Sequence, residues 1–121
     1  MTADDLQLAY LRFSHSEDLI DAEFTADSLT EDLNIEQMGQ ELFTLLEKFD
    51  CSRMVLGLGR VEYITSAALG KLITLHRRMH RRDGRLVLFG LQGSVAEVMK
   101  TSRLLDYFNV APDHNSAVSQ A

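Results

Sequence analysis

Hydrophobic and polar residues follow three patterns along this chain. Residues 19–24 (LIDAEF) alternate one by one, which predicts a β-strand with one buried face. In residues 69–79 apolar side chains recur every three or four positions, which predicts an amphipathic helix. Residues 53–58 (RMVLGL) and 85–90 (RLVLFG) are apolar runs without alternation, typical of parallel strands covered on both faces. This order predicts a βαβ unit with a right-handed crossover, and therefore an α/β fold.

The segments before this unit predict a hairpin and a helix. Residues 6–13 (LQLAYLRF) alternate and predict a first strand, which a turn within residues 14–18 joins to the 19–24 strand. A helix is predicted over residues 35–48 from an apolar stripe at helical spacing, and Asn34 and Gln37 have the spacing of a capping box at its start. These elements and the βαβ unit form a mixed sheet of four to five strands with helices packed on it.

A third helix is predicted over residues 95–105, with Leu105 facing inward. Ser94 and Glu97 form a capping box before it. After it, the apolar residues from Tyr107 to Val110 either return to the sheet edge or pack on this helix. Residues 112–121 are polar, and we expect a disordered tail after a single domain that covers residues 1–111.

The start of the central helix is the most informative stretch. Thr65 and Ser66 precede it, and either hydroxyl fits the N-cap position, while Gly84 fits its end. Residues 67–70 (AALG) carry no acid, so the positive end of the helix has no compensating charge in its first turn. Such a terminus accommodates a phosphate, and a phosphorylated Ser66 would add about −1.5 to −2 charges. The alternative is that Ser66 is only a cap that stabilises the helix by about 1 kcal/mol.

Charge and composition narrow the class of protein. The first 50 residues hold 13 acidic and 2 basic side chains, whereas the rest hold 5 and 10. An acidic first half argues against nucleic-acid binding, and the basic end of the central helix compensates the helix dipole. No apolar run approaches the roughly 18 residues of a membrane span, and the acidic first ten residues do not resemble a secretion signal. The lone Cys51, expected to be inert packing, fits a reducing cytoplasm.

Candidate catalytic groups are poorly arranged. Gly57 and Gly59 start a dinucleotide-loop pattern, but Glu62 stands at its third glycine. His76 and His80 lie one turn apart with no third metal ligand, and His76 is expected on the core face. A nucleophilic Ser66 needs a nearby base, which only His15 or His114 would supply through the fold. We therefore expect no enzyme, no metal and no cofactor.

The order of these elements resembles the STAS domain of bacterial anti-sigma factor antagonists. The resemblance covers about residues 6–110. It is sharpest at residues 61–70 (VEYITSAALG) and continues through residues 84–88 (GRLVL) and the Ser94 helix. Phosphorylated members of that family read Asp-Ser-Ser/Thr-Gly-Leu-Gly at this corner, and the serine after the aspartate accepts the phosphate.

Laid on this chain, the motif places Thr65 at the aspartate and Ser66 at the acceptor. Ala67 and Ala68 replace Ser/Thr and Gly, while Leu69 and Gly70 match. The missing aspartate leaves Thr65 open as an alternative acceptor. The resemblance implies a partner-binding surface, made of residues Glu62, Thr65, Ser66, Ala67, Ala68, Gly70 and Lys71.

The resemblance also implies the partners. The expected partner is an anti-sigma factor that is itself a serine kinase, and this partner would be released when Ser66 is phosphorylated. A phosphatase and a second copy of the chain are further possible partners. The alternative is a non-phosphorylated STAS interaction subunit of a signalling scaffold or of a lipid-transporter complex.

Overall fold

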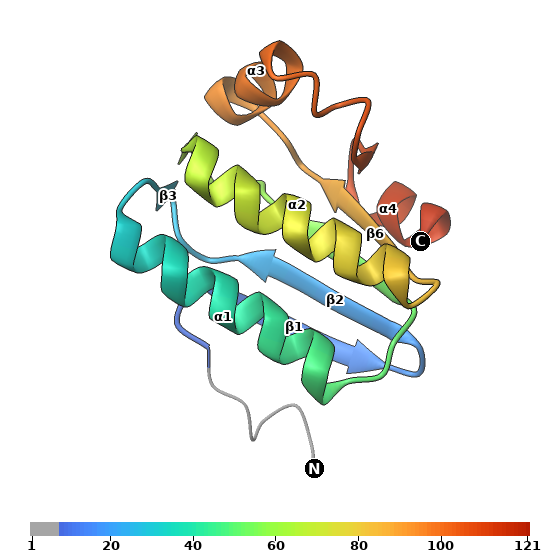
Figure 1. Ribbon diagram of the computed structural model, residues 1–121. Helices are drawn as coiled ribbons and strands as arrows, with labels where there is room; N and C mark the ends of the chain where they lie inside the picture. Colours follow the sequence, from blue (N-terminus) through green and yellow to red (C-terminus); the bar gives the residue numbers. More distant parts are fainter. Residues whose placement is uncertain (1–7) are drawn as a thin grey trace.

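A computed structural model describes residues 8–121, which form a five-stranded mixed sheet with helices on both faces and a small two-stranded sheet (Figure 1). Its strands are β1 (Leu11–Ser16), β2 (Leu19–Phe24), β3 (Ser28–Leu29), β4 (Arg53–Gly57), β5 (Tyr63–Ile64), β6 (Arg85–Phe89) and β7 (Asn109–Ala111). Its helices are α1 (Asp32–Lys48), α2 (Ser66–Arg81), α3 (Gly93–Thr101) and α4 (His114–Gln120).

The main sheet has the order β1-β2-β4-β6-β7, and a small second sheet pairs β3 with β5. Only β1 is antiparallel in the main sheet; β2, β4, β6 and β7 pair in parallel. The predicted mixed sheet of four to five strands is therefore confirmed. Of the two alternatives for the segment after α3, the structure shows the return to the sheet edge, where β7 pairs with β6. In a parallel sheet the carboxyl ends of the strands meet at one edge, so α1, α2 and α3 all begin near that edge (Figure 1).

Alternating side chains of the central strands build two cores. Met54 and Leu56 of β4 face α1 and α2, together with Leu86 and Leu88 of β6. Val55 of β4 faces the other way and belongs to a second apolar cluster. That cluster lies under α4, and its buried members are Val55, Val87, Ala111 and Ala117.

Helix α4 is where the structure differs most from the sequence-based expectation. Residues 112–121 were expected to be disordered, but α4 forms, with the Asp113 carboxylate accepting from the Ser116 N–H at 2.8 Å. Arg53 holds the end of the chain by donating to the carbonyls of Val118 and Ala121. A short polar sequence forms a helix here because it covers apolar strand residues that would otherwise face water.

The N-terminal elements begin elsewhere than predicted. The predicted first strand lies partly outside the described residues, and pairing starts only at Leu11, because the Glu41 carboxylate accepts from the backbone N–H groups of Ala9 and Tyr10 at 2.9 Å. Helix α1 starts at Asp32 rather than residue 35, and its N-cap Glu31 makes no side-chain cap bond. The predicted Asn34 capping box is wrong, since Asn34 Oδ1 accepts instead from the Tyr10 hydroxyl at 2.6 Å.

The third helix also departs from its prediction. It spans Gly93–Thr101 and ends before Arg103, whose φ is 61°. The Ser94 capping box is wrong, because the Ser94 hydroxyl lies inside the helix and donates to the Glu62 carbonyl. Leu105 lies beyond the helix and is 38% exposed, so it does not face the core as predicted.

Helix α2 ends in a Schellman motif around Asp83. Asp83 adopts φ 56°, and the Gly84 N–H donates to the Met79 carbonyl at 2.7 Å. Gly84 is needed for a different reason than predicted: a Cβ on it would lie 2.8 Å from the Ser52 carbonyl. Within the helix, Leu75 is buried in the core, whereas His76 is only half-buried.

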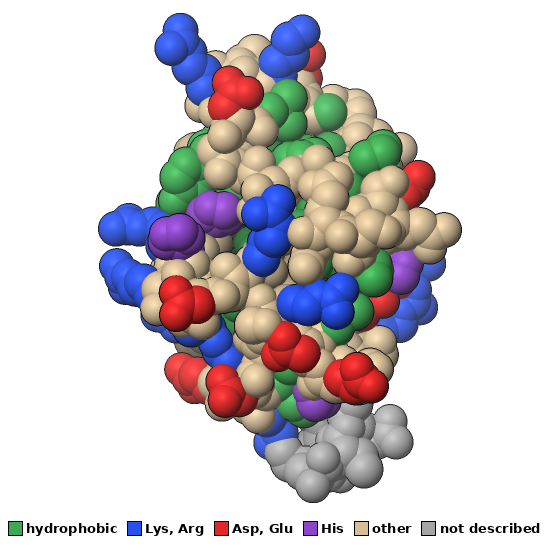
Figure 2. All heavy atoms as spheres, turned by 90° about the vertical axis from the view of Figure 1, so that its right-hand side faces the viewer, with side chains coloured by type: hydrophobic (Ala, Val, Ile, Leu, Met, Phe, Trp, Pro, Cys, Tyr) green, Lys and Arg blue, Asp and Glu red, His purple; other side chains and the backbone are tan. Residues whose placement is uncertain are grey.

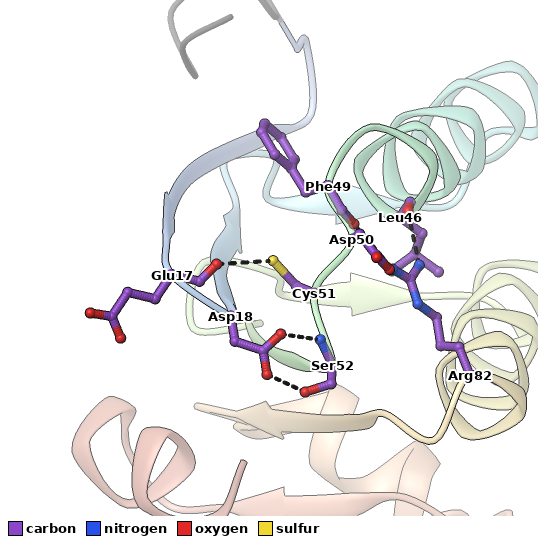
Figure 3. A network of polar contacts seen from close by, with 8 residues as sticks. All are labelled: Glu17, Asp18, Leu46, Phe49, Asp50, Cys51, Ser52 and Arg82. Carbon is purple, nitrogen blue, oxygen red and sulfur yellow. Dashed lines mark hydrogen bonds and ion pairs between the residues drawn. The ribbon is translucent and has the colours of Figure 1, made fainter.

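At the opposite edge of the sheet, polar contacts tie the β1–β2 turn to the start of β4 and the end of α2 to the end of α1 (Figure 3). The Asp18 carboxylate accepts from the backbone N–H of Ser52 at 2.8 Å and from its hydroxyl. Arg82 donates to the carbonyls of Leu46 and Phe49. Cys51 is buried between them, and burial raises the pKa of its thiol, so it packs rather than reacts.

Candidate functional site

The corner between β5 and α2 is held by the small β3–β5 sheet. The backbone N–H of Thr65 donates to the Leu29 carbonyl at 3.2 Å, and Glu62 donates in the same way to Asp27 at 2.7 Å. The Ser94 hydroxyl secures the same loop from α3 by its bond to Glu62. The loop before α2 is therefore held by two segments that lie far from it in the sequence, residues 27–29 and the first turn of α3.

Thr65, and not Ser66, is the N-cap of α2. The Thr65 hydroxyl oxygen accepts from the Ala68 N–H at 3.3 Å, and the same hydroxyl donates to the Leu29 carbonyl at 3.4 Å. The Thr65 side chain is half-buried by these contacts. Ser66 is the first helical residue, so the alternative in which its hydroxyl serves only as a cap does not hold.

Ser66 and Ala67 are both exposed at the tip of α2. Backbone N–H groups in the first turn of a helix have no partner within the helix, and here the Thr65 side chain takes only one of them. No acidic residue stands in this first turn. The tip is therefore electropositive, sterically open and headed by a hydroxyl that solvent reaches.

The other residues predicted for the partner surface are less accessible. Ala68 is fully buried and joins the apolar face of α2, so its side chain cannot contact a partner. Gly70 is half-buried, although nothing lies within 4 Å of where its Cβ would be. Lys71 packs across Gly39 of α1, and its ammonium pairs with Glu36 at 3.0 Å. The Lys71 ammonium, which was expected to contact a partner, is therefore engaged in an ion pair within the chain.

Two exposed apolar side chains near this tip were not identified from the sequence. Tyr63 of β5 is 59% exposed and Leu33, on the first turn of α1, is 78% exposed. Both elements end or begin at the same end of the molecule as the start of α2 (Figure 1). Tyr63 and Glu62 also line a depression of about 440 Å³ beside Ser94. We call Leu33, Glu62, Tyr63, Ser66 and Ala67 the tip surface.

The histidines considered as partners for Ser66 in catalysis lie elsewhere. His15 stacks on Phe49, which follows the last residue of α1, with ring centroids 4.4 Å apart. His114 starts α4 and its Nε2 lies 2.6 Å from an Asp21 carboxylate oxygen. Neither imidazole is placed to take a proton from Ser66.

The STAS domain family matches residues 7–117, nearly the whole chain, and the protein belongs to that family. Among curated proteins it is similar to BtrV of Bordetella bronchiseptica, described as a candidate anti-sigma factor antagonist, with 36% identity over 86 residues that cover 71% of this chain and 73% of BtrV.

Solved structures share the fold at low sequence identity. The candidate anti-sigma factor antagonist TM1081 of Thermotoga maritima superposes with a TM-score of 0.78 at 17% identity, over 91% of this chain and 92% of that one. The anti-sigma factor antagonist SpoIIAA of Bacillus, solved in its phosphorylated form, superposes with a TM-score of 0.67 at 14% identity, over 91% and 97%.

These similarities define the protein class. The chain has the STAS fold of anti-sigma factor antagonists, which are regulatory binding domains and not enzymes. Across residues 8–121, no helix combines the length and apolar character that crossing a membrane requires. The function of such a domain rests on which surface it presents to a partner.

Proposed function

We propose that this protein is an anti-sigma factor antagonist that binds its partner through the tip surface and releases it when Ser66 is phosphorylated. The partner is an anti-sigma factor with serine kinase activity, and a phosphatase resets the switch. The observation that carries the proposal is the exposed Ser66 hydroxyl on an uncompensated helix N-terminus. SpoIIAA, which shares this fold, supports it by having been solved in both phosphorylation states.

Ser66 is favoured over Thr65 as the acceptor. A kinase needs the hydroxyl oxygen free to attack a phosphoryl group in line. The Thr65 oxygen is engaged as the N-cap and contacts the Leu29 carbonyl, so its phosphorylation would remove a cap that stabilises α2 by about 1 kcal/mol. Phosphorylation of Ser66 leaves this cap in place.

The effect of phosphate on docking follows from charge and solvation. A phosphoserine carries about −1.5 to −2 charges, and the free N–H groups of its own helix tolerate that charge. A partner that covers the tip surface would have to desolvate the dianion beside the apolar side chains of Leu33 and Tyr63. Converting a complex from 99% bound to 1% bound needs about 5.5 kcal/mol, a cost that an unpaired buried phosphate supplies.

The test is binding of single-residue variants to the cognate partner. We expect Ser66→Ala to retain binding. Ser66→Asp should weaken binding by at least about tenfold; this is a smaller effect than that of phosphate, because a single carboxylate carries less charge. Ser119→Asp adds the same charge on α4, away from the tip surface, and should bind like the native chain. Equal affinities for Ser66→Asp and Ser119→Asp would refute the proposed switch.

One observation favours a second function. Thr65 stands where the phosphorylated relatives carry aspartate, so a kinase that recognises that carboxylate would not find it here. In this alternative the chain is a constitutive STAS subunit of a signalling scaffold or of a lipid-transporter complex. Intact-mass measurement with the cognate kinase and ATP distinguishes the two: a chain that gains no phosphate yet still binds its partner supports the second function.

A further inference from the structure

A trough lies between the C-terminal half of α2 and the segment after α3, at the far end of α2 from Ser66. It consists of two adjoining depressions of about 390 and 340 Å³ that share three lining residues, His76, His80 and Tyr107. Figure 2 shows two adjacent histidines with Lys or Arg side chains beside them on this side of the molecule. The basic trough, as we call it, is lined by residues His76, Arg77, His80, Arg81, Gly84, Arg85, Leu86, Tyr107 and Asn109.

The charges around the basic trough are of one sign. Arg77 and Arg81 come from α2 and Arg85 from the start of β6, and no carboxylate is among the lining residues. Within residues 8–121 none of these three guanidinium groups makes an ion pair, whereas Arg82, on the same turn, pairs with Asp50 at 3.1 Å. Compensation of the α2 dipole explains cations in its last turn, but it does not account for Arg85, which belongs to a strand.

His76 forms part of the wall of the basic trough. Its Nδ1 is buried and has no hydrogen-bond partner among the described residues. The ring packs against Tyr107, with centroids 4.8 Å apart, and against Phe108 at 5.5 Å. Burial, followed by the positive charges of His80 and Arg85, lowers the His76 pKa. The wall of the basic trough therefore carries positive charges and no carboxylate, which favours an anion over a cation in the hollow.

We propose that the basic trough binds a small phosphate-bearing molecule. Arginine guanidinium groups present paired N–H donors that match the oxygens of phosphate. Arg77 and Arg81 line one of the two adjoining depressions, and Arg85 lines the other. The hollow has the volume of a small-molecule site, and the tilted rings of His76 and Tyr107 provide an aromatic wall for an apolar part of the ligand. Each of these features is independent of the tip surface and of Ser66.

The test uses inorganic pyrophosphate as the probe and the full chain at fixed ionic strength, followed by two-dimensional NMR. We expect saturable shifts of the His76 and Tyr107 resonances and a rise in the His76 pKa on binding, because an anion stabilises the imidazolium against His80 and Arg85. Arg81→Ala should weaken binding about tenfold, the effect of losing one charge-assisted hydrogen bond.

Arg78→Ala is the matched control. Arg78 lies on the same helix and carries the same charge, but it sits over the Phe43 ring, 4.1 Å from its centroid, and does not line the trough. Ser66→Ala should bind pyrophosphate like the native chain. The proposal is overturned if the shifts do not saturate, if Arg78→Ala and Arg81→Ala weaken binding equally, or if an acidic peptide of equal charge binds more tightly, which would make the trough a protein interface.

Discussion

The substitution Val87→Thr tests whether α4 covers the second face of the sheet. Valine and threonine have the same shape and both favour strands, so the exchange is close to neutral where a strand side chain faces water. Val87 is fully buried in a cluster whose other buried members, Val55, Ala111 and Ala117, are all apolar. A hydroxyl at that position would lose its water without gaining a side-chain partner.

The expected cost follows from that geometry. Mutational data place the burial of an unpaired hydroxyl at about 1–3 kcal/mol, and we expect a loss of about 2 kcal/mol in the free energy of unfolding. Urea denaturation followed by circular dichroism measures it, because the chain has no tryptophan. Val110→Thr, at a half-buried position on the neighbouring strand β7, is the control and should cost less. A loss below about 0.5 kcal/mol at Val87 would mean that α4 is not docked there.

The remaining predictions concern single hydrogen-bonding groups. Thr65→Ala should lower the free energy of unfolding by about 1 kcal/mol through loss of the Ala68 cap bond, measured by urea denaturation; a loss as large in Ser66→Ala would contradict the assigned cap. The hydrogen bonds from Ser52 hold the pKa of Asp18 below its ordinary value of 3.8. The Asp18 carboxylate therefore stabilises the fold above pH 3.8, and this stabilisation is lost as pH falls through the lower folded pKa. The difference in the free energy of unfolding between the native chain and Asp18→Asn should shrink only in acid. A difference that does not change with pH would refute this role of Asp18. Glu41→Gln should lower the free energy of unfolding by about 1–3 kcal/mol and speed amide exchange at Tyr10, because a side-chain amide oxygen accepts only one of the two N–H groups that the carboxylate accepts. Unchanged exchange would mean that Glu41 does not hold the backbone at Ala9 and Tyr10.

The two-sided burial of the central strands was visible in the sequence, whereas its cause was not. Residues 53–58 show no alternation, which predicts cover on both faces. The cover on the second face is α4, from a segment that looks disordered by composition. A short polar segment carries almost no helical signal of its own, and its helix exists only because the sheet presents an apolar surface to it. The non-alternating apolar run at residues 53–58 was therefore the available sequence signal that some element covers the second face of the sheet.

The residues around the site divide in the same way. Local spacing predicted a helix that starts at the Thr65–Ser66 corner without an acid in its first turn, and the structure has this helix. Spacing failed for the capping boxes at Asn34 and Ser94, because each side chain is bonded to a residue distant in the sequence, Tyr10 and Glu62 respectively. Capping patterns compete with tertiary partners that a linear pattern does not contain.

The sequence alone determined what depends on neighbours along the chain: the period of the β2 strand and of α2, the apolar runs of β4 and β6, and the resemblance at residues 61–70. Tertiary structure decided which hydroxyl at the corner is the cap and which is exposed, where the apolar side chains of Leu33 and Tyr63 lie, and which face α4 covers. The physical reason is that periodicity reflects burial of one face, which is local, whereas hydrogen-bond partners and exposure depend on contacts between segments brought together only by folding.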